Sequence, residues 1–289
     1  MLRLLRKTKL KVNLLPTPTI VKANHAMPWL AFLLFLSSVL PSKAQNCTDG
    51  CEVRQCSGEI LEYDLVYHWG FISTVAGHVT FSVGDTVVNG STHPCYRGFG
   101  WSEPSWNWFY EVNSTYVSYT DSTLFPLFFS RKGIEGSEIY DREYYVSGNT
   151  ATVNDRDEDG QLERKQLELL PCSFDVISAV YYCRAIDFKA MNTGETIPLN
   201  LFLDGETYTS YVRYIGIQNW VHPETGITHE CIVFKPWLID GTVFSEGENM
   251  TVFVSNTPDK IPLYIETDLL VGKAEVYFVP EKSTLVTGK

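Results

Sequence analysis

No familiar catalytic signature occurs in the sequence. It contains no GxSxG, no HExxH and no glycine-rich phosphate-binding loop. These patterns place a serine nucleophile, a pair of zinc ligands and a phosphate cradle, respectively. Their absence makes the common serine hydrolases, zinc proteases and nucleotide-binding enzymes poor candidates, although a triad assembled from distant positions would leave no such pattern.

No apolar run is long enough for a membrane-spanning helix. The run in residues 29–40, "WLAFLLFLSSVL", follows a basic, acid-free stretch and is too short to cross a bilayer. Ser42 and Ala44 occupy the small-residue positions of a signal-peptidase site. We therefore expect residues 1–44 to be a signal peptide, with Met1 or Met27 as the start. The mature chain would lack a transmembrane segment and be exported to the periplasm or cell envelope.

Basic residues are scarce after this segment. Removing residues 1–44 removes seven of the 23 Lys and Arg residues and none of the 34 acidic ones, leaving 16 against 34 and a formal charge of −18. Such a surface repels phosphate backbones and anionic lipids. Nucleic acid is therefore excluded as a partner, whereas a neutral ligand or calcium is compatible.

Seven cysteines occur, and in an exported chain they are first candidates for disulfides. Their odd number leaves at least one outside any intrachain pair, and the sequence does not give their connectivity. Cys47, Cys51 and Cys56 cluster, but their spacing is not CxxC and no HxxxH follows. Zinc binding is therefore the weaker alternative.

Alternation of apolar and polar residues dominates the mature chain. In "LEYDLVYHW", Leu61, Tyr63 and Tyr67 share one face while Glu62 and His68 fall on the other, as in a half-buried strand. Similar strands are expected within residues 75–83, 207–221, 227–236, 250–256, 261–267 and 272–279. The pattern predicts a mainly β protein, built as one large curved antiparallel sheet or an incomplete β-barrel. We expect a Cys-containing segment at 45–57, a single β domain at 58–281 and a tail at 282–289.

One segment has helical spacing instead. Residues 174–185 repeat apolar positions every three or four residues, and Ser173 or Asp175 can cap the first free amides. We predict one short helix here, packed on the concave face or in an open end of the sheet.

Several stretches resemble a known bacterial family. They include "CEVRQCSGEILEYDLVYHWGFISTVAGHVTFSV", "FDVISAVYYCRAIDF" and "VSNTPDKIPLYIETDLLVGKAEVYF". The distinguishing residues are Gly58-Glu59, Trp69-Gly70-Phe71-Ile72, Ala76-Gly77, Pro126, Arg131, Glu135-Gly136, Asp175, Ser178, Arg184 and Pro262. Over nearly the whole mature chain, the sequence is similar to the family called domain of unknown function 3108. The resemblance implies an exported protein of a Gram-negative envelope with a largely antiparallel β fold and no established reaction.

Arg131, Glu135, Asp175 and Arg184, with Trp69, are the candidate ligand-binding residues. They can converge where the helix meets the sheet, to hold a ligand or, more commonly, to form structural ion pairs. Carboxylates flanking a cleft also suit a glycosidase, but the sequence gives no separation between them. No catalytic residue can be assigned, and we leave open whether the protein is an enzyme.

Aromatic and histidine residues offer further candidates. "WSEPSWNWFYEV" is rich in rings, and Trp106 and Trp108 are expected on one strand face, to fill the interior or to stack on a sugar. His68 and His78 are candidates to face each other across the first hairpin, as a metal pair or as ordinary surface residues.

"DRDEDG", residues 155–160, resembles the first half of a calcium loop. Asp155, Asp157 and Asp159 fall at positions one, three and five, and Gly160 at six. Position twelve is Gln166 instead of the usual glutamate, and the flanking segments look like strands. A polar hairpin tip is the preferred interpretation, with weak calcium binding as the alternative and no other cofactor expected.

Three functional hypotheses follow. The first is a binding or carrier module for an apolar or glycan ligand, the second is a glycan-processing enzyme, and the third is a structural envelope protein without a ligand. An apolar lining favours the carrier, and opposed acids near an exposed Trp favour the enzyme.

Overall fold

The computed structural model describes residues 56–239 and 245–286, and the features below belong to that part of the chain. The strands are β1 (Ile60–Trp69), β2 (Ile72–Val88), β3 (Ser91–Ser102), β4 (Val112–Thr120), β5 (Pro126–Glu135), β6 (Glu138–Ser147), β7 (Thr150–Arg156), β8 (Leu162–Glu168), β9 (Ser173–Phe174), β10 (Thr196–Pro198), β11 (Asn200–Leu203), β12 (Glu206–Tyr208), β13 (Tyr211–Val221), β14 (Thr228–Pro236), β15 (Met250–Ser255), β16 (Pro262–Asp268) and β17 (Lys273–Phe278). The helices are α1 (Val176–Ala185) and the short 3₁₀ turns η1 (Phe188–Ala190) and η2 (Pro280–Lys282).

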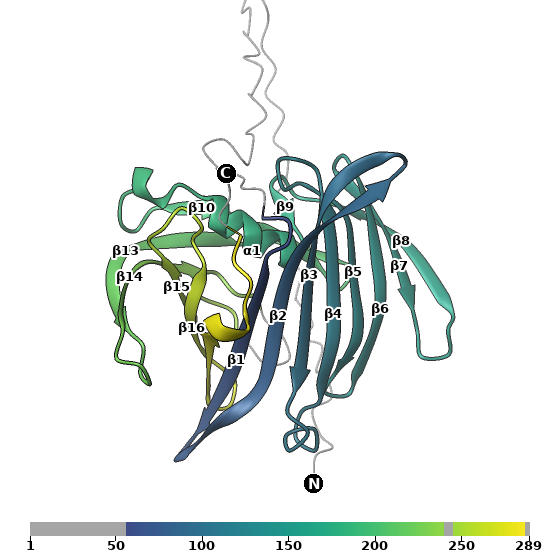
Figure 1. Ribbon diagram of the computed structural model, residues 1–289. Coiled ribbons are helices and arrows are strands. Elements are labelled where there is room, and N and C mark those ends of the chain that lie inside the picture. The colour runs from purple at the N-terminus through teal and green to yellow at the C-terminus, as the bar shows by residue number, and fades with distance from the viewer. Residues whose placement is uncertain (1–55, 240–244, 287–289) are drawn as a thin grey trace, which may run out of the picture. The chain divides into compact units, whose positions relative to one another are not determined.

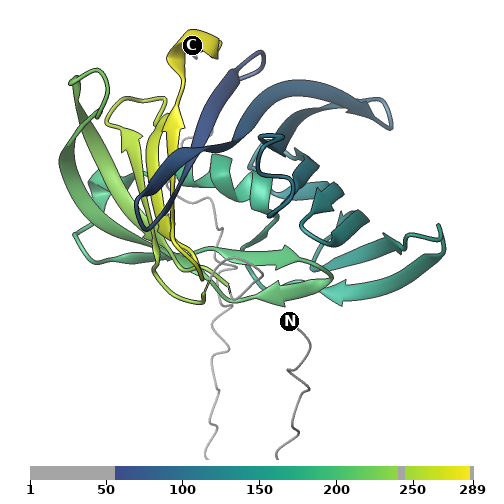
Figure 2. The same cartoon turned by 90° about the horizontal axis from the view of Figure 1, so that it is seen from below.

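One antiparallel sheet of 14 strands forms the body of the fold. Its order is β10-β13-β14-β15-β16-β17-β1-β2-β3-β4-β5-β6-β7-β8, so the last strand pairs with the first. The two edge strands, β10 and β8, do not pair with each other, and the sheet therefore stays open. It curves around α1 in Figures 1 and 2. The predicted mainly β fold, a large curved antiparallel sheet with one helix, is confirmed.

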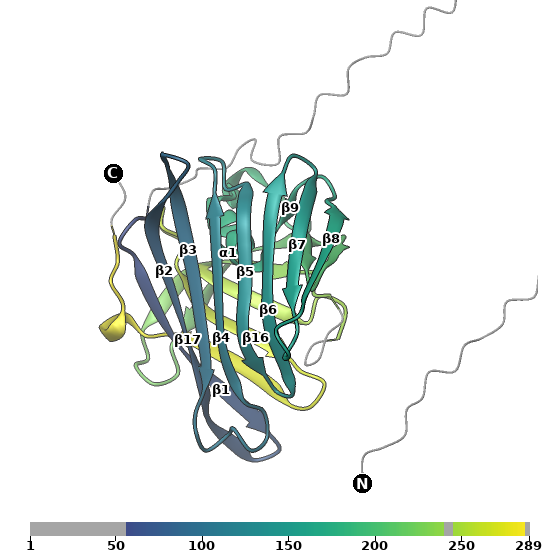
Figure 3. The ribbon, with the colours of Figure 1, turned by 90° about the vertical axis from the view of Figure 1, so that its right-hand side faces the viewer.

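Strand alternation explains which face is buried. Leu61, Tyr63 and Tyr67 of β1 are buried, whereas the neighbouring Glu62 and His68 are only partly buried. Figure 3 shows β2 to β8 following one another side by side, each joined to the next by a hairpin or short connection. Segments in which apolar and polar residues alternate, separated by a few turn residues, form antiparallel strands with short connections.

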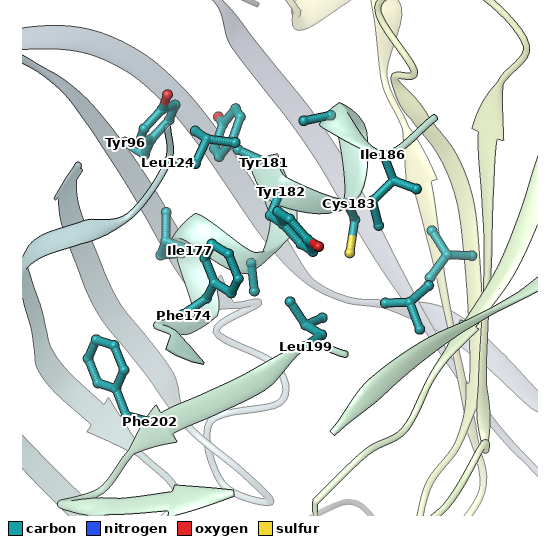
Figure 4. Close-up of a cluster of buried hydrophobic side chains, with 14 of the residues drawn as sticks. Tyr96, Leu124, Phe174, Ile177, Tyr181, Tyr182, Cys183, Ile186, Leu199 and Phe202 are labelled. Carbon is teal, nitrogen blue, oxygen red and sulfur yellow. The ribbon is translucent and has the colours of Figure 1, made fainter. Parts of the chain in front are cut away.

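The helix fills the concave side of the sheet. α1 starts at Val176, after the two residues of β9, and therefore confirms the predicted helix apart from its first two residues. It packs against β3 and β4, and Figure 4 shows its side chains within a cluster of buried hydrophobic residues. Gly98 of β3 allows this close approach, because a Cβ there would lie 2.8 Å from Cδ1 of Ile177. A small second sheet, β12-β11-β9, lies beside the helix: β11 contacts α1, and β12 contacts β8 of the large sheet.

The strands predicted between residues 207 and 279 form, whereas two local details differ from the prediction. β13 pairs with β14 and β15 with β16, and β17 joins β16 to β1. β2 begins at Ile72 and not at residue 75, so the segment "GFISTVAG" is mostly strand and only Gly70 and Phe71 form the turn between β1 and β2. Residues 103–111 form turns instead of a strand carrying Trp106 and Trp108 on one face. Thr284, in the predicted tail, bridges to Ile60.

The cysteines divide into different states. Cys172 is disulfide-bonded, whereas Cys95 and Cys231 are buried thiols. Burial raises the pKa of Cys231 to about 11, so this thiol is unreactive at neutral pH. Cys47 and Cys51, two of the three candidate zinc ligands, lie outside the described residues, as does the predicted signal peptide.

Candidate functional site

Arg131 and Glu135 lie together at the centre of a charged network on the concave face. Nη2 of Arg131 is 2.7 Å from Oε2 of Glu135, four residues along β5. Nη1 donates to both carboxylate oxygens of Asp204, at 2.7 and 2.9 Å. Asp204 stands in the turn between β11 and β12, so Arg131 ties the small sheet to the large one.

Further residues complete this network. Arg142 of β6 donates to Asp204 at 2.8 Å and to Asp155 at 2.5 Å. The hydroxyl of Tyr116 donates to Glu135, and the guanidinium carbon of Arg131 lies 3.4 Å from the centre of the Tyr140 ring. Arg142, Asp204, Tyr116 and Tyr140 were not predicted from the sequence, because they come from β4, β6 and the β11–β12 turn, whose pairing a sequence pattern does not give.

Electrostatics keep Arg131 charged despite its burial. Burial alone would lower its pKa, but Tyr116, Asp204 and Glu135 together raise it. Burial and the adjacent carboxylate of Glu135 raise the pKa of Tyr116, so its phenol remains a donor. The charged groups of Arg131 and Glu135 are therefore paired with each other and hydrogen-bonded to neighbouring side chains.

An open pocket of about 570 Å³ adjoins the network. Glu135 and Tyr140 belong to both, and the residues of the β3–β4 connection form the opposite wall. The lining residues are Asn107, Trp108, Phe109, Tyr110, Glu111, Glu135, Gly136, Ser137, Glu138 and Tyr140. Gly136 lets the wall close on the β5–β6 turn: its φ is +65°, and a Cβ there would lie 2.5 Å from the Tyr110 ring. The lining therefore combines aromatic rings with carboxylates.

Asp175 does not join this network. It is fully buried and caps α1, accepting hydrogen bonds from the amides of Ile177 and Ser178 at 2.8 and 2.9 Å. Its second oxygen accepts from the hydroxyls of Ser118 and Ser178, at 2.7 and 2.8 Å. Asp175 thus anchors the helix to β4.

Arg184 and Trp69 lie at opposite ends of β1. Arg184 forms a two-pronged salt bridge with Glu59, at 2.6 and 2.8 Å. Glu59 directly precedes β1 and Trp69 ends it, and a ten-residue strand is about 30 Å long. The five candidate binding residues therefore form separate groups, and of the five only Glu135, the partner of Arg131, lines the pocket.

The segment "DRDEDG" forms the tip of the β7–β8 hairpin. Asp155 is paired with Arg142, and the Asp157 carboxylate accepts from the backbone amide of Gln161 at 2.7 Å, closing the turn. Between residues 56 and 286, apart from the gap at 240–244, no group of three His, Cys, Asp or Glu side chains is arranged to hold a metal ion. Weak calcium binding by Asp155, Asp157 and Asp159 therefore stays a prediction, and Asp155 already has Arg142 as its partner.

The two histidines do not face each other. In the β1–β2 ladder His78 is opposite Asp64, and His68 is opposite Ser73. His78 lies between Asp64 and Glu103, at 2.8 and 2.6 Å. His68 lies 2.8 Å from Glu275. Register, which the sequence pattern does not fix to the residue, separates the predicted pair.

Glu275 collects hydrogen bonds from four side chains. Tyr277, Lys273, Tyr264 and His68 approach its carboxylate at 2.7 to 3.0 Å. Burial opposes ionisation of this group, but the hydrogen bonds outweigh burial and lower its pKa to about 2. The carboxylate is therefore held ionised on β17.

We expect Glu275 to make stability depend on acid pH. The pKa of Glu275 in the folded protein lies below the ordinary value of 4.5. Its contribution to the free energy of unfolding is therefore fully present above about pH 4.5 and is lost as the pH falls towards 2. After allowance for solvent screening, Glu275→Gln should cost about 1–2 kcal/mol at neutral pH and less in acid. Urea unfolding at several pH values measures this difference. Glu163→Gln, at an exposed position of β8, is the control; a Glu275→Gln cost that does not change with pH contradicts the prediction.

Fold and site together define a class of protein. It is an open, β-barrel-like protein in which one curved antiparallel sheet wraps a single helix and leaves a pocket at one end. The chain belongs to the family described as Protein of unknown function (DUF3108), whose model matches residues 62–279. The resemblance seen in the sequence is thereby confirmed.

A solved structure supports the fold. A β-barrel-like protein of the domain of unknown function DUF1849 from Brucella abortus is similar, with a TM-score of 0.53, 10% identity, and coverage of 81% of this chain and 100% of that one. The lipoprotein LppX of Mycobacterium tuberculosis matches with a TM-score of 0.16, 10% identity, and coverage of 82% and 89%. The first match shows a shared fold alone. The second is too weak to show one. No curated protein matches the sequence.

Proposed function

We propose that this protein is an exported binding or carrier module of the cell envelope, whose ligand presents an apolar or sugar-ring face to the pocket. The observation that carries the proposal is the pocket wall, where Trp108, Phe109, Tyr110 and Tyr140 line about 570 Å³. Aromatic rings with a few polar groups are typical of small-molecule and glycan sites. Glu135 forms a salt bridge with Arg131. This pairing favours a fixed surface for ligand recognition over a site for proton transfer.

The export part of the proposal comes from the basic, then apolar, N-terminal segment with small residues before Gln45. Within the described residues, no helix is long and apolar enough to cross a membrane. The seven cysteines fit an oxidising compartment, and Cys172 is disulfide-bonded.

Native mass spectrometry of the protein purified from its own envelope tests the binding role. We expect a co-purified small molecule that Trp108→Ala releases, because removing a central aromatic contact weakens binding about tenfold or more. Ile139→Ala is the matched control, since Ile139 is exposed on β6 beside Tyr140 but on the other face. A wild-type chain without ligand, or a ligand that survives Trp108→Ala, contradicts the proposal.

A glycan-processing enzyme is the second candidate, because Glu111 and Glu138 line the same pocket beside the exposed Trp108. Within the described residues, neither side chain forms a hydrogen bond or salt bridge. Incubation with envelope glycans, followed by mass analysis, separates the two candidates. Cleavage that Glu138→Gln abolishes supports the enzyme, and binding without cleavage supports the carrier.

A further inference from the structure

Three loops at one end of the sheet carry no charged residue. They are the β1–β2 turn with its flanking strand residues, 69–77, "WGFISTVAG", the β16–β17 turn 269–272, "LLVG", and residues 105–110 of the β3–β4 connection, "SWNWFY". Together we call them the aromatic tip. In a chain with 20% charged residues, three neutral loops are a departure from the rest of the surface.

Contacts centred on Tyr67 hold these loops side by side. The Tyr67 hydroxyl donates to the carbonyl of Val271 at 2.9 Å. Its ring centre lies 5.3 Å from that of Trp106 and 6.5 Å from that of Phe109. Figures 1 and 3 show the β1–β2 turn and the β3–β4 connection at the same end of the fold. The aromatic tip is therefore a fixed surface and not three independent loops.

Its apolar side chains face solvent. Phe71 is 102% exposed and Trp108 is 81% exposed. The other exposed apolar members are Trp69, Ile72, Val75, Phe109, Leu270 and Val271. Monomeric proteins seldom expose a contiguous apolar surface of this kind unless it contacts a partner.

The absence of charged residues in the aromatic tip indicates the kind of surface that it contacts. A basic protein surface would be met by acids, and the tip has none although the mature chain carries a formal charge of −18. An anionic surface would be repelled by the rest of the chain. A neutral bilayer surface fits, because Trp and Phe on neutral loops partition into the interface between headgroups and acyl chains.

We propose that the aromatic tip docks on the surface of a zwitterionic phospholipid bilayer. Phe71 and Leu270 insert at the level of the headgroups without spanning the membrane. Docking holds the neighbouring pocket at the bilayer surface, because Trp108 and Phe109 belong to both the pocket and the tip. The proposal stands without the pocket's function, since Phe71 and Leu270 do not line the pocket.

Flotation of the purified, naturally processed chain with phosphatidylcholine vesicles tests docking. We expect the wild type to float with the vesicles and the double variant Phe71→Ser/Leu270→Ser to bind at least about tenfold more weakly. Phe71→Trp should retain binding, and raising the salt concentration should change it little, since no charge pairs form. Val87→Ser is the matched control: Val87 is 69% exposed but lies at the far end of the 17-residue β2.

Unfolding curves establish that the double variant is folded, which the exposure of both side chains predicts. Absence of wild-type binding to neutral vesicles overturns the proposal. So does binding that the double variant retains, or binding that requires anionic lipid. A dimer that Phe71→Ser dissociates, without vesicle binding, shows a second copy as the partner and also overturns it. Ligand binding in the pocket is measured separately with Trp108→Ala, so the two proposals fail independently.

Discussion

Replacing Arg184 by alanine is expected to lower the free energy of unfolding by about 3–5 kcal/mol. Arg184 lies in the last turn of α1, and both of its terminal nitrogens donate to Glu59. Its Nε donates to the carbonyl of Asp259 at 3.1 Å. Glu59 is 1% exposed, so the variant would leave a buried carboxylate without its cation. The cost comes mainly from that stranded charge, because the lost attraction was largely offset by desolvation of the pair.

Urea unfolding monitored by circular dichroism measures the effect. The double variant Glu59→Leu/Arg184→Met should recover much of the loss, since an apolar pair leaves no buried charge. Arg213→Ala is the matched control: its salt bridge with Glu248 is partly exposed, and its loss should cost much less than the loss of Arg184. An Arg184→Ala cost no larger than that of Arg213→Ala would contradict a structural role for the buried pair.

The Arg184–Glu59 pair also makes Arg184 a poor binding site for a ligand. It joins the helix to the residue before β1 and, through Asp259, to the β15–β16 turn. A ligand carboxylate at Arg184 would have to displace Glu59 from a dry position. Of the predicted binding residues, Arg131 and Glu135 remain the pair beside a pocket, which moves the candidate site towards the β5–β6 turn.

Local patterns predicted most of the fold. Period-two alternation in residues 61–69 and 250–267 indicated strands, and helical spacing in 174–185 indicated α1, because each pattern depends on which face of a local element is buried. The cap was also local, since a carboxylate at Asp175 can reach amides two and three residues on. The residues "SEPSWN" carry turn formers, and giving more weight to Pro104 would have predicted turns at Trp106 and Trp108.

The site could be predicted only in part because its contacts are distant in sequence. Arg131 meets Asp204 across 73 residues, and Arg184 meets Glu59 across 125. Sequence pattern gives the face on which a side chain lies but not the partner strand or its register, and the bulge at Leu65/Val66 shifts the β1–β2 register. Arg131 and Glu135 became candidates through the family resemblance, and they meet because they lie four residues apart on β5. Asp204 gave no signal beyond its place in an "LDGE" turn.

Asp175 is the second position where a substitution should have a large effect. The side chain is 0% exposed, and its two oxygens accept from two backbone amides and two hydroxyls. Ser118, one of the hydroxyl donors, is equally buried on β4. The carboxylate thus fixes the start of α1 and its position on the concave face in one step. Burial raises the pKa of Asp175, against the opposite effect of these hydrogen bonds.

Asp175→Ala is therefore expected to cost about 2–4 kcal/mol, combining a lost helix cap with donors left unsatisfied in the interior. Asp175→Asn should cost less, because its carbonyl oxygen can still accept from the amides of Ile177 and Ser178. Asp187→Ala is the matched control: Asp187 caps η1 at an exposed position, and its loss should cost less than about 1 kcal/mol. Urea unfolding measures all three variants. If Asp175 served a ligand instead of the helix, Asp175→Ala would leave stability unchanged and reduce only ligand retention in native mass spectrometry, and that result would refute the capping role.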